Sequence, residues 1–372
     1  MLSKEEIARY ARHLSLSEFG VEGQEKLRTA KVLVIGAGGL GCPALQYLTA
    51  VGVGEIGIVD FDKVDLSNLQ RQILYSPEDI GSSKAETAAK KLSKQNPFVK
   101  FSVYNLKLDT TNALEIFRSY DMIIDGSDNF ATRYLVNDAC VLLNKPLVYG
   151  SIFKFEGQVS VFNHKNGPTY RCVFPEPPSP DSSPSCAVTG VLGVLPGIIG
   201  TIQATEAIKL ITGLGETLSG RLLLFDALTM NFNSMIVTRT EEGVNAAPKT
   251  RDEFLNTDHD HFCGSRTTDA ELKSISANAL QALLEKMEGI QLVDVREINE
   301  QPKIDELMDL QIPLSKLPSG SELISANKVI VYCQSGTRSK RAIAILQKQF
   351  PTTEFYNLKG GINEWVQTFE LK

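Results

Sequence analysis

The sequence predicts an α/β protein with two domains, and three observations lead to that prediction. Two short runs of β-branched and aliphatic residues, at 32–35 and 328–332, each end in a turn that leads into a helical pattern. The chain has 372 residues, more than one ordinary core holds. Periodicity disappears over 238–268, where the composition is that of a linker. We therefore expect a first domain over 1–245, a linker over 246–270 and a smaller α/β domain over 271–372.

The first strand leads into a glycine-rich turn that reads GAGGLG. Its glycines are Gly36, Gly38, Gly39 and Gly41. Glycine lets backbone N–H groups approach a phosphate, and the N-terminus of the following helix adds partial positive charge. A second strand over 55–59 ends in Asp60, at about the spacing at which a carboxylate accepts hydrogen bonds from a ribose. This context predicts a Rossmann-like nucleotide site.

Polar residues after Asp60 supply the groups that phosphoryl chemistry needs. Guanidinium and ammonium groups neutralise phosphate oxygens, and a carboxylate holds Mg²⁺. Arg71, Lys84 and Asp128 provide these groups. Asp128 follows a strand at 120–125, at the edge where open α/β sheets bind ligands. A structural role, as the cap of a helix beginning near residue 132, fits the same position.

Two further features lie outside this pattern. Ser3 followed by Glu5 predicts a capped helix over 5–13, from which Arg12 projects. Residues 176–185 are rich in proline and serine and predict a surface loop, and Cys186 follows just before an apolar helix. A thiol at that helix start is exposed and its thiolate is favoured by the helix dipole, although an inert surface thiol fits the same position.

The strand at 328–332 leads directly into Cys333. The loop from Cys333 to Arg338 then passes into a helix over 340–349. Such a turn surrounds the sulfur with backbone N–H groups and stabilises a thiolate or a persulfide. Arg338 can pair with an oxyanion. A buried structural thiol is the alternative for Cys333.

Four strings in the first domain resemble the MoeB/ThiF group of E1-like adenylyltransferases. They are GAGGLG, DFDKVDLSNLQRQ, IGSSKAE and DGSDNFATR, and the resemblance runs from about residue 5 to about residue 237. It implies that ATP and Mg²⁺ activate the C-terminal glycine of a ubiquitin-fold sulfur-carrier protein ending in Gly-Gly. It also implies that Arg12 reaches the ATP of a partner subunit, hence a homodimer, and that Cys186 takes part in covalent chemistry with the carrier. The matching nucleotide-binding positions are Gly36, Gly38, Gly39, Gly41, Asp60, Ser67, Asn68, Leu69, Gln70, Arg71, Lys84, Asp128 and Asn129, with Mg²⁺ at Asp128.

The second domain resembles a rhodanese. LVDVRE, the CxxGxRS loop and LKGGINEW carry the resemblance, which covers about residue 271 to residue 372. The related loop of tyrosine phosphatases has five residues between Cys and Arg, whereas four separate Cys333 from Arg338. The shorter ring is sized for sulfane sulfur. The stretch that reads HIxGA in rhodaneses forms one wall of their active-site pocket. In this sequence it is shortened to residues 309–313.

The sequence departs from the adenylating family at the expected zinc site. Many members hold zinc between two CxxC pairs, but only Cys172 remains of the first pair and none of the second. We therefore expect no structural zinc. The alternative is a metal site with an irregular set of ligands, namely Cys172, His259, His261 and Cys263.

Composition and charge limit the classes of partner that we expect and the cellular compartment in which the protein acts. A net charge of −6 argues against nucleic acid, and six scattered cysteines suit a reducing cytosol. The N-terminal sequence does not have the pattern of a secretion signal. The apolar run at 190–202 is too short for a membrane span. We expect a cytoplasmic enzyme that adenylates a carrier and transfers sulfur from a Cys333 persulfide, for molybdopterin, thiamine or a related pathway. The alternatives are an NAD-dependent oxidoreductase fused to a sulfurtransferase and a non-catalytic carrier scaffold.

Overall fold

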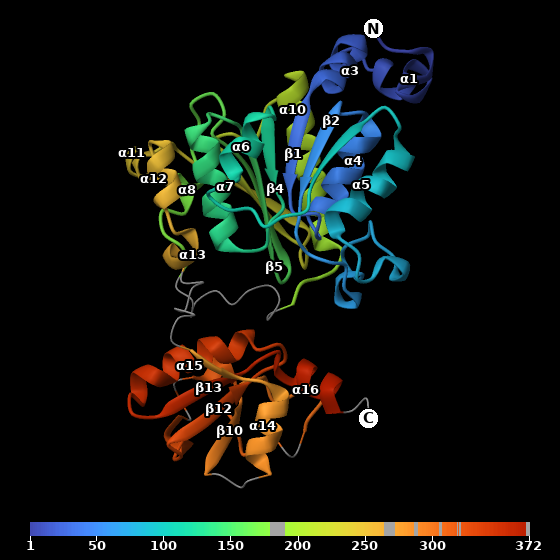
Figure 1. Cartoon of the computed structure of the whole chain (residues 1–372). Coiled ribbons are helices and arrows are strands. Elements are labelled where there is room, and N and C mark those ends of the chain that lie inside the picture. Colours follow the sequence, from blue (N-terminus) through green and yellow to red (C-terminus); the bar gives the residue numbers. More distant parts are fainter. Residues whose placement is uncertain are drawn as a thin grey trace. The chain divides into compact units, whose positions relative to one another are not determined.

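The computed structural model describes residues 1–178, 190–263, 272–285, 289–304, 307–317, 319 and 321–369. The chain divides into two compact units, Met1–Cys263 and Gly264–Lys372, and each is built from helices packed on a sheet (Figure 1). Within the described ranges, none of the helices is both long and apolar enough to cross a membrane.

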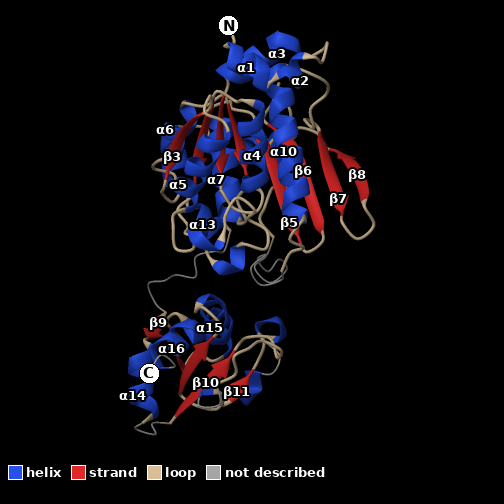
Figure 2. Ribbon diagram, turned by 90° about the vertical axis from the view of Figure 1, so that its right-hand side faces the viewer, coloured by secondary structure: helices blue, strands red, loops and turns tan. Residues whose placement is uncertain are grey.

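A mixed sheet forms the centre of the first unit. Its strand order is β3-β2-β1-β4-β5-β6-β7-β8. The first five strands of the chain run parallel, and β6, β7 and β8 are antiparallel to their neighbours at one edge (Figure 2). The strands are β1 (Lys31–Ile35), β2 (Glu55–Val59), β3 (Lys100–Tyr104), β4 (Met122–Asp125), β5 (Leu147–Phe153), β6 (Glu156–Phe162), β7 (Arg221–Asp226) and β8 (Asn231–Ile236).

Helices cover both faces of this sheet. Val32 and Val34 of β1 pack into one hydrophobic core, and Leu33 and Ile35 pack into the other. A strand buried on both faces is a continuous apolar run, which is why β1 was readable from the sequence. The helices are α1 (Lys4–Arg9), α2 (Ala11–Leu14), α3 (Gly20–Thr29), α4 (Gly41–Val51), α5 (Lys84–Gln95), α6 (Ala113–Arg118), α7 (Phe130–Leu142), α8 (Tyr170–Val173), α10 (Leu195–Thr212), α11 (Glu241–Asn245), α12 (Arg251–Asn256) and α13 (His259–Phe262), with 3₁₀ turns at Leu66–Asn68 and Pro77–Asp79.

The N-terminal segment has the predicted cap but not the predicted single helix. The Ser3 hydroxyl accepts from Glu6 N at 3.1 Å, and the Glu6 carboxylate accepts from Ser3 N at 2.7 Å. The helix then breaks at Tyr10 into α1 and α2. Tyr10 is buried, and its hydroxyl accepts from Asn96 Nδ2 at 2.9 Å, so tertiary contacts decide the break.

The expected linker over 246–270 is wrong for residues 246–263. This stretch contains α12 and α13, which pack against α7, and it belongs to the first unit. Phe254 of α12 and His259 of α13 are buried. Both helices are too short to show a periodic pattern, so long-range packing rather than local sequence defines them.

A smaller parallel sheet forms the second unit, in the order β11-β10-β12-β13-β9. Its strands are β9 (Lys273–Ile275), β10 (Ile290–Asp294), β11 (Leu310–Gln311), β12 (Lys328–Tyr332) and β13 (Glu354–Leu358). Its helices are α14 (Ala277–Leu284), α15 (Thr337–Gln349) and α16 (Gly361–Phe369), with 3₁₀ turns at Leu314–Lys316 and Ser321–Leu323. β12 runs directly into the Cys333 loop and α15, as the sequence predicted.

Candidate functional sites

The glycine loop lies where β1 meets α4, and two of its glycines are required by close packing. Gly36 has a φ of +86°, and its N–H donates to Val59 O at 2.8 Å. A Cβ on Gly36 would lie 2.9 Å from Gly126 O, and one on Gly41 would lie 1.8 Å from Gly36 O. Neither position accommodates a side chain. The loop therefore stays a bare backbone cradle at the N-terminus of α4, as phosphate binding requires.

Asp60 braces this loop from the end of β2. Its two carboxylate oxygens accept from Ala37 N and from Asp62 N, each at 2.8 Å. Burial raises the pKa of Asp60, against the opposing effects of the Ala37 hydrogen bond and nearby Lys84. A carboxylate has about four acceptor sites, so Asp60 retains capacity for a ribose hydroxyl.

Lys84 stands at the start of α5 and is paired within its own chain. Its ammonium lies 3.0 Å from the carboxylate of Asp62, and its side chain is buried while that of Asp62 is half exposed. The hydroxyl of Tyr75 lies 2.8 Å from Ala37 O and 3.1 Å from Lys84 O. Asp62 and Tyr75 thus join α5 to the glycine loop. Neither residue was predicted from the sequence, although Asp62 stands only two residues after Asp60.

The SNLQRQ string lies beside the glycine loop. A Cβ on Gly39 would lie 3.7 Å from Arg71 Cδ, and one on Gly38 would lie 3.6 Å from Gln72 Nε2. Arg71 is half-buried, and its Nη1 donates to Ser67 O at 3.0 Å. The structure therefore brings the side chain of Arg71 beside the glycine loop.

The neighbouring predicted residues shape this segment. Ser67 N donates to the Asp65 carboxylate at 2.8 Å, and Asn68 Oδ1 accepts from Asp65 N at 3.2 Å. Leu69 packs against the first hydrophobic core. A Cβ on Gly193 would lie 2.5 Å from Gln70 O, so Gln70 packs against the segment that precedes α10. Local hydrogen bonds and packing thus fix the segment that carries Arg71.

Asp128 and Asn129 follow β4, and the structure separates their roles. Asn129 Oδ1 accepts from Thr132 N at 2.9 Å and caps α7. The cap is therefore Asn129, and the capping alternative for Asp128 was wrong. Asp128 is exposed, two residues beyond Gly126, where a Cβ would lie 3.2 Å from Gly41 N. An exposed carboxylate on a loop packed against the glycine loop has the oxygen chemistry that Mg²⁺ prefers.

Gln72 Oε1 is buried at this edge and has no hydrogen-bond partner within the described part of the chain. The Gln72 side chain lies beside Gly38 of the glycine loop. Buried polar atoms are nearly always paired, so this oxygen is available to water or a ligand. With the bare cradle, two cations and a carboxylate, the residues present fit ATP and Mg²⁺.

Two predicted residues are not brought to this edge. Arg12 is exposed on α2, and Tyr10 beside it packs against Gly52, which precedes β2. The N-terminal helices thus lie at the amino-terminal edge of the strands, opposite the glycine loop (Figure 2). Arg12 does not approach the cradle of its own chain. Cys186 lies outside the described residues.

A hydrogen bond from Thr240 to Cys172 joins the two segments where the resemblance places zinc ligands. Cys172 Sγ accepts from Thr169 N and Thr240 N, each at 3.4 Å. Burial raises the pKa of the Cys172 thiol, but hydrogen bonds from Thr169 and Thr240 outweigh it, and the pKa lies below its ordinary value. Among the described residues, no group of three or more His, Cys, Asp or Glu side chains is arranged to hold a metal ion.

A buried ionic cluster lies beside Cys172 and holds α13 in place. Asp138 accepts from Arg171 Nε at 2.7 Å and Nη2 at 2.8 Å, and its Oδ2 lies 2.9 Å from His259 Nε2. The Arg171 guanidinium also lies over the rings of Tyr134 and Phe262. His259 is therefore committed to Asp138, and this cluster explains why residues 259–263 are not a linker.

Cys333 lies in the second unit, where β12 ends. The whole residue is buried, its Sγ accepts from Gly336 N at 3.2 Å, and Ser339 Oγ lies 3.5 Å from the sulfur. Gly336 has a φ of +86° at the N-cap of α15. This is the predicted turn, with a backbone N–H donating to the sulfur, while the Ser339 hydroxyl also lies 2.6 Å from Asn357 Oδ1.

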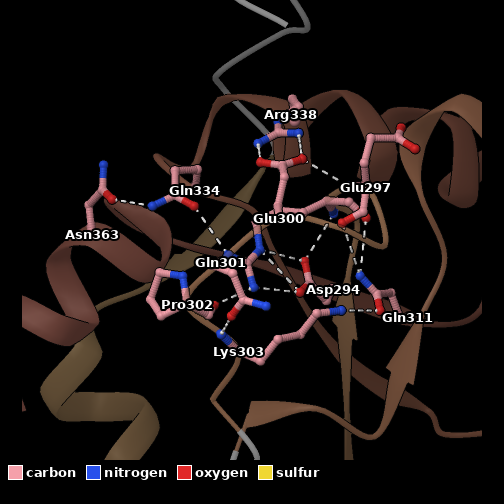
Figure 3. Close-up of polar contacts among 11 residues, drawn as sticks. Asp294, Glu297, Glu300, Gln301, Pro302, Lys303, Gln311, Gln334, Arg338 and Asn363 are labelled. Atoms are coloured by element: carbon pink, nitrogen blue, oxygen red, sulfur yellow. Dashed lines mark hydrogen bonds and ion pairs between the residues drawn. The ribbon is translucent and has the colours of Figure 1, made fainter. Parts of the chain in front are cut away.

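Arg338 closes the loop, and it is already paired (Figure 3). Its Nη1 and Nη2 donate to the two carboxylate oxygens of Glu300 at 2.5 and 2.7 Å. Glu300 Oε1 also accepts from Glu297 N at 2.8 Å. The sequence predicted that Arg338 pairs with an oxyanion, but it gave no local signal for Glu300, which stands 38 residues earlier.

Asp294 and Arg296 of the LVDVRE string form the floor of the Cys333 loop. Arg296 and Asp294 are buried and joined by several hydrogen bonds, the shortest 2.9 Å. Arg296 also donates to Gln334 Oε1 at 3.1 Å, which links this pair to the Cys333 loop. The abbreviated wall is present as β11, where Gln311 donates to Arg296 O at 3.4 Å.

Fold and sites together define a two-part enzyme class, in which a nucleotide-binding adenylation unit is joined to a unit with a sulfur-binding cysteine loop. Residues 10–245 match the ThiF family, and residues 276–368 match the rhodanese-like domain. The chain belongs to the ThiF family and carries a rhodanese-like domain at its C-terminal end. It is an adenylyltransferase with sulfurtransferase activity.

Similar proteins support both parts. The chain is 44% identical over 380 residues to the "Probable adenylyltransferase/sulfurtransferase MoeZ" of Mycobacterium tuberculosis, covering 99% of this chain and 95% of that protein. It is 51% identical over 270 residues to the "Sulfur carrier protein adenylyltransferase" of Thermus thermophilus, covering 71% and 99%. E. coli MccB, solved with ATP, shares the fold with a TM-score of 0.56 at 24% identity, covering 63% of this chain and 72% of that one. The family and these relatives favour adenylyl transfer over an NAD-dependent oxidoreductase.

Proposed function

We propose that the first unit uses MgATP to adenylate the C-terminal glycine of a ubiquitin-fold sulfur-carrier protein that ends in Gly-Gly. The Thermus thermophilus relative is named for a sulfur carrier protein, which supports this substrate class. The observation that carries the proposal is the meeting of the glycine loop, Arg71, Lys84 and the Asp128 loop at the carboxyl ends of β1, β2 and β4.

The chemistry at this edge is positioning and charge neutralisation. The carrier carboxylate attacks the α-phosphorus of ATP, giving an acyl-adenylate and pyrophosphate. Asp60 holds the ribose, and Arg71 and Lys84 neutralise phosphate oxygens, for which Lys84 exchanges its Asp62 partner. Asp128 holds Mg²⁺, which supplies further positive charge when bound. The proposal includes no structural zinc.

The second unit supplies the sulfur. The Cys333 thiolate takes a sulfur atom from a sulfane donor and becomes a persulfide. The terminal persulfide sulfur attacks the carbonyl of the acyl-adenylate, AMP leaves, and the carrier is joined to Cys333 through an acyl disulfide. A thiolate then attacks the Cys333 sulfur and releases the carrier as a thiocarboxylate. Because both units belong to one chain, the persulfide is present at high effective concentration.

Cys186 and Arg12 complete the proposal. Cys186 either forms a transient thioester with the carrier or resolves the acyl disulfide, and in the second case an external thiol reduces its disulfide with Cys333. Arg12 lies at the far edge of its own sheet, which supports a homodimer in which it reaches the partner subunit's nucleotide. The protein would act in the cytosol, in molybdopterin, thiamine or related biosynthesis.

Separating the two half-reactions tests the proposal. C333A should retain carrier-dependent ATP–pyrophosphate exchange and lose thiocarboxylate formation, as followed by the mass of the carrier. C263A, which removes a half-buried thiol of the first unit, should retain both. If exchange disappears in C333A while the variant stays folded, the proposed division of labour is wrong. A scaffold would bind nucleotide and release no pyrophosphate from any carrier.

A further inference from the structure

The pairing of Arg338 with Glu300 bears on which sulfur donor the second unit accepts. Two chemical classes can load the cysteine. Thiosulfate carries two negative charges, and its reaction is S₂O₃²⁻ + Cys333-S⁻ → Cys333-S-S⁻ + SO₃²⁻. A persulfide carries one charge on its reacting sulfurs, and its reaction is R-S-S⁻ + Cys333-S⁻ → R-S⁻ + Cys333-S-S⁻. Both are exchanges of a sulfur atom that need no added oxidant or reductant.

Arg338 is the cationic side chain of the loop that begins at Cys333, and both ends of its guanidinium are occupied. The two bonds to Glu300 are bidentate, the strongest arrangement for such a pair. Glu300 is also held from behind by the backbone N–H of Glu297 at 2.8 Å. The carboxylate is therefore fixed in place before any donor arrives.

Arg296, the other arginine of this floor, is committed too. It is buried and bonded to Asp294, to Gln334 Oε1 at 3.1 Å and to Pro302 O at 2.9 Å. A dianion approaching Cys333 thus meets an arginine whose charge is already neutralised, next to a carboxylate that repels it. The hydrogen-bonded pair with Glu300 raises the pKa of Arg338.

We propose that Glu300 determines donor specificity, disfavouring thiosulfate and leaving the site selective for a persulfide donor. Glu300 acts through Arg338 and through its own charge, so it is a specificity-determining residue without touching the transferred sulfur. The inference rests on the sulfurtransferase part of the proposed function.

The test compares two donors in the full-length protein, with cyanide as the acceptor and thiocyanate as the readout. Sodium thiosulfate and glutathione persulfide are the donors, and the rate with C333A is subtracted as the uncatalysed background. Wild-type protein should show a higher kcat/KM with glutathione persulfide than with thiosulfate. E300Q should lower the KM for thiosulfate by about tenfold with little change in kcat, since one nearby negative charge is removed and Arg338 is released. Its KM for glutathione persulfide should change less than about twofold.

E297Q is the matched control. It removes the same charge three residues away, keeps the backbone N–H that holds Glu300, and should leave the thiosulfate KM unchanged. An unchanged thiosulfate KM in folded E300Q, or an equal fall in E297Q, overturns the proposal. If E300Q does not fold, a wild-type preference for thiosulfate still overturns it and a preference for persulfide supports it. No thiocyanate from either donor would instead overturn the sulfurtransferase function.

Discussion

Asp138 offers the sharpest test of what holds the first unit together. D138N keeps the size of the side chain and removes the charge that Arg171 and His259 share. The side chains of Asp138, Arg171 and His259 are 0%, 5% and 4% exposed, so water cannot replace the lost partner. Removing one member of a buried ion pair costs about 3–5 kcal/mol, because the other charge stays buried and unpaired. For a unit of this size we expect the melting temperature to fall by roughly 6–20 °C.

The chain supplies its own internal reference for this measurement. It has a single tryptophan, and Trp365 lies in the second unit. Far-UV circular dichroism should show an earlier transition in D138N, while the Trp365 fluorescence transition stays where it is in the wild type. Adding R171M, which removes the stranded cation but keeps its apolar stem, should recover part of the loss. A shift below about 2 °C, or two substitutions that simply add, would refute the assignment of this energy to buried charge.

The same cluster of Asp138, Arg171 and His259 should make the stability of the first unit depend on pH. Burial raises the pKa of Asp138, but hydrogen bonds from Arg171 and His259 outweigh it, so the pKa of Asp138 lies below its ordinary value. The ionised form is favoured in the folded state. Its contribution is therefore fully present above the ordinary carboxyl pKa of about 4 and is lost as the pH falls through the lower folded value. D138N should flatten the acid limb of the stability curve.

Three further expectations follow from the first unit. G41A should abolish ATP binding in calorimetry, because a Cβ would lie 1.8 Å from a backbone oxygen, whereas G197A, with open space around it, should bind normally. N129A should lower stability by about 1 kcal/mol through loss of the α7 cap, and chemical denaturation of D128N should show no such loss. Cys172 should react with iodoacetamide at pH 7.5 faster than Cys263, whose pKa burial raises to about 12, as peptide mass spectrometry can show; faster labelling of Cys263 would contradict this.

Local patterns were readable from the sequence because they act through neighbouring residues. The apolar run of β1, the glycine turn and the Cys333 turn each depend on residues within about ten positions. α12 and α13 were not readable, since they depend on contacts such as the one from His259 to Asp138, 121 residues apart in the chain. Glu300 was missed for the same reason. The assignment of the α7 cap failed by one position, because Asp and Asn cap equally well and only the backbone decides between them.

The segments around Cys172 and Thr240, where the resemblance to the adenylating family would place zinc ligands, are in direct contact. Thr240 N lies 3.4 Å from Cys172 Sγ and links the two segments, while Thr169 N and Oγ1, from the same segment as Cys172, lie 3.4 and 3.3 Å from the sulfur. A Cβ on Gly243 would lie 2.7 Å from Cys172 Cα, so α8 and α11 are in backbone contact and leave no room for a larger residue there. This contact between α8 and α11 depends on one sulfur acceptor and on close packing. It should therefore withstand chelators, and G243A should weaken it more than C172S, which keeps an acceptor in the same place.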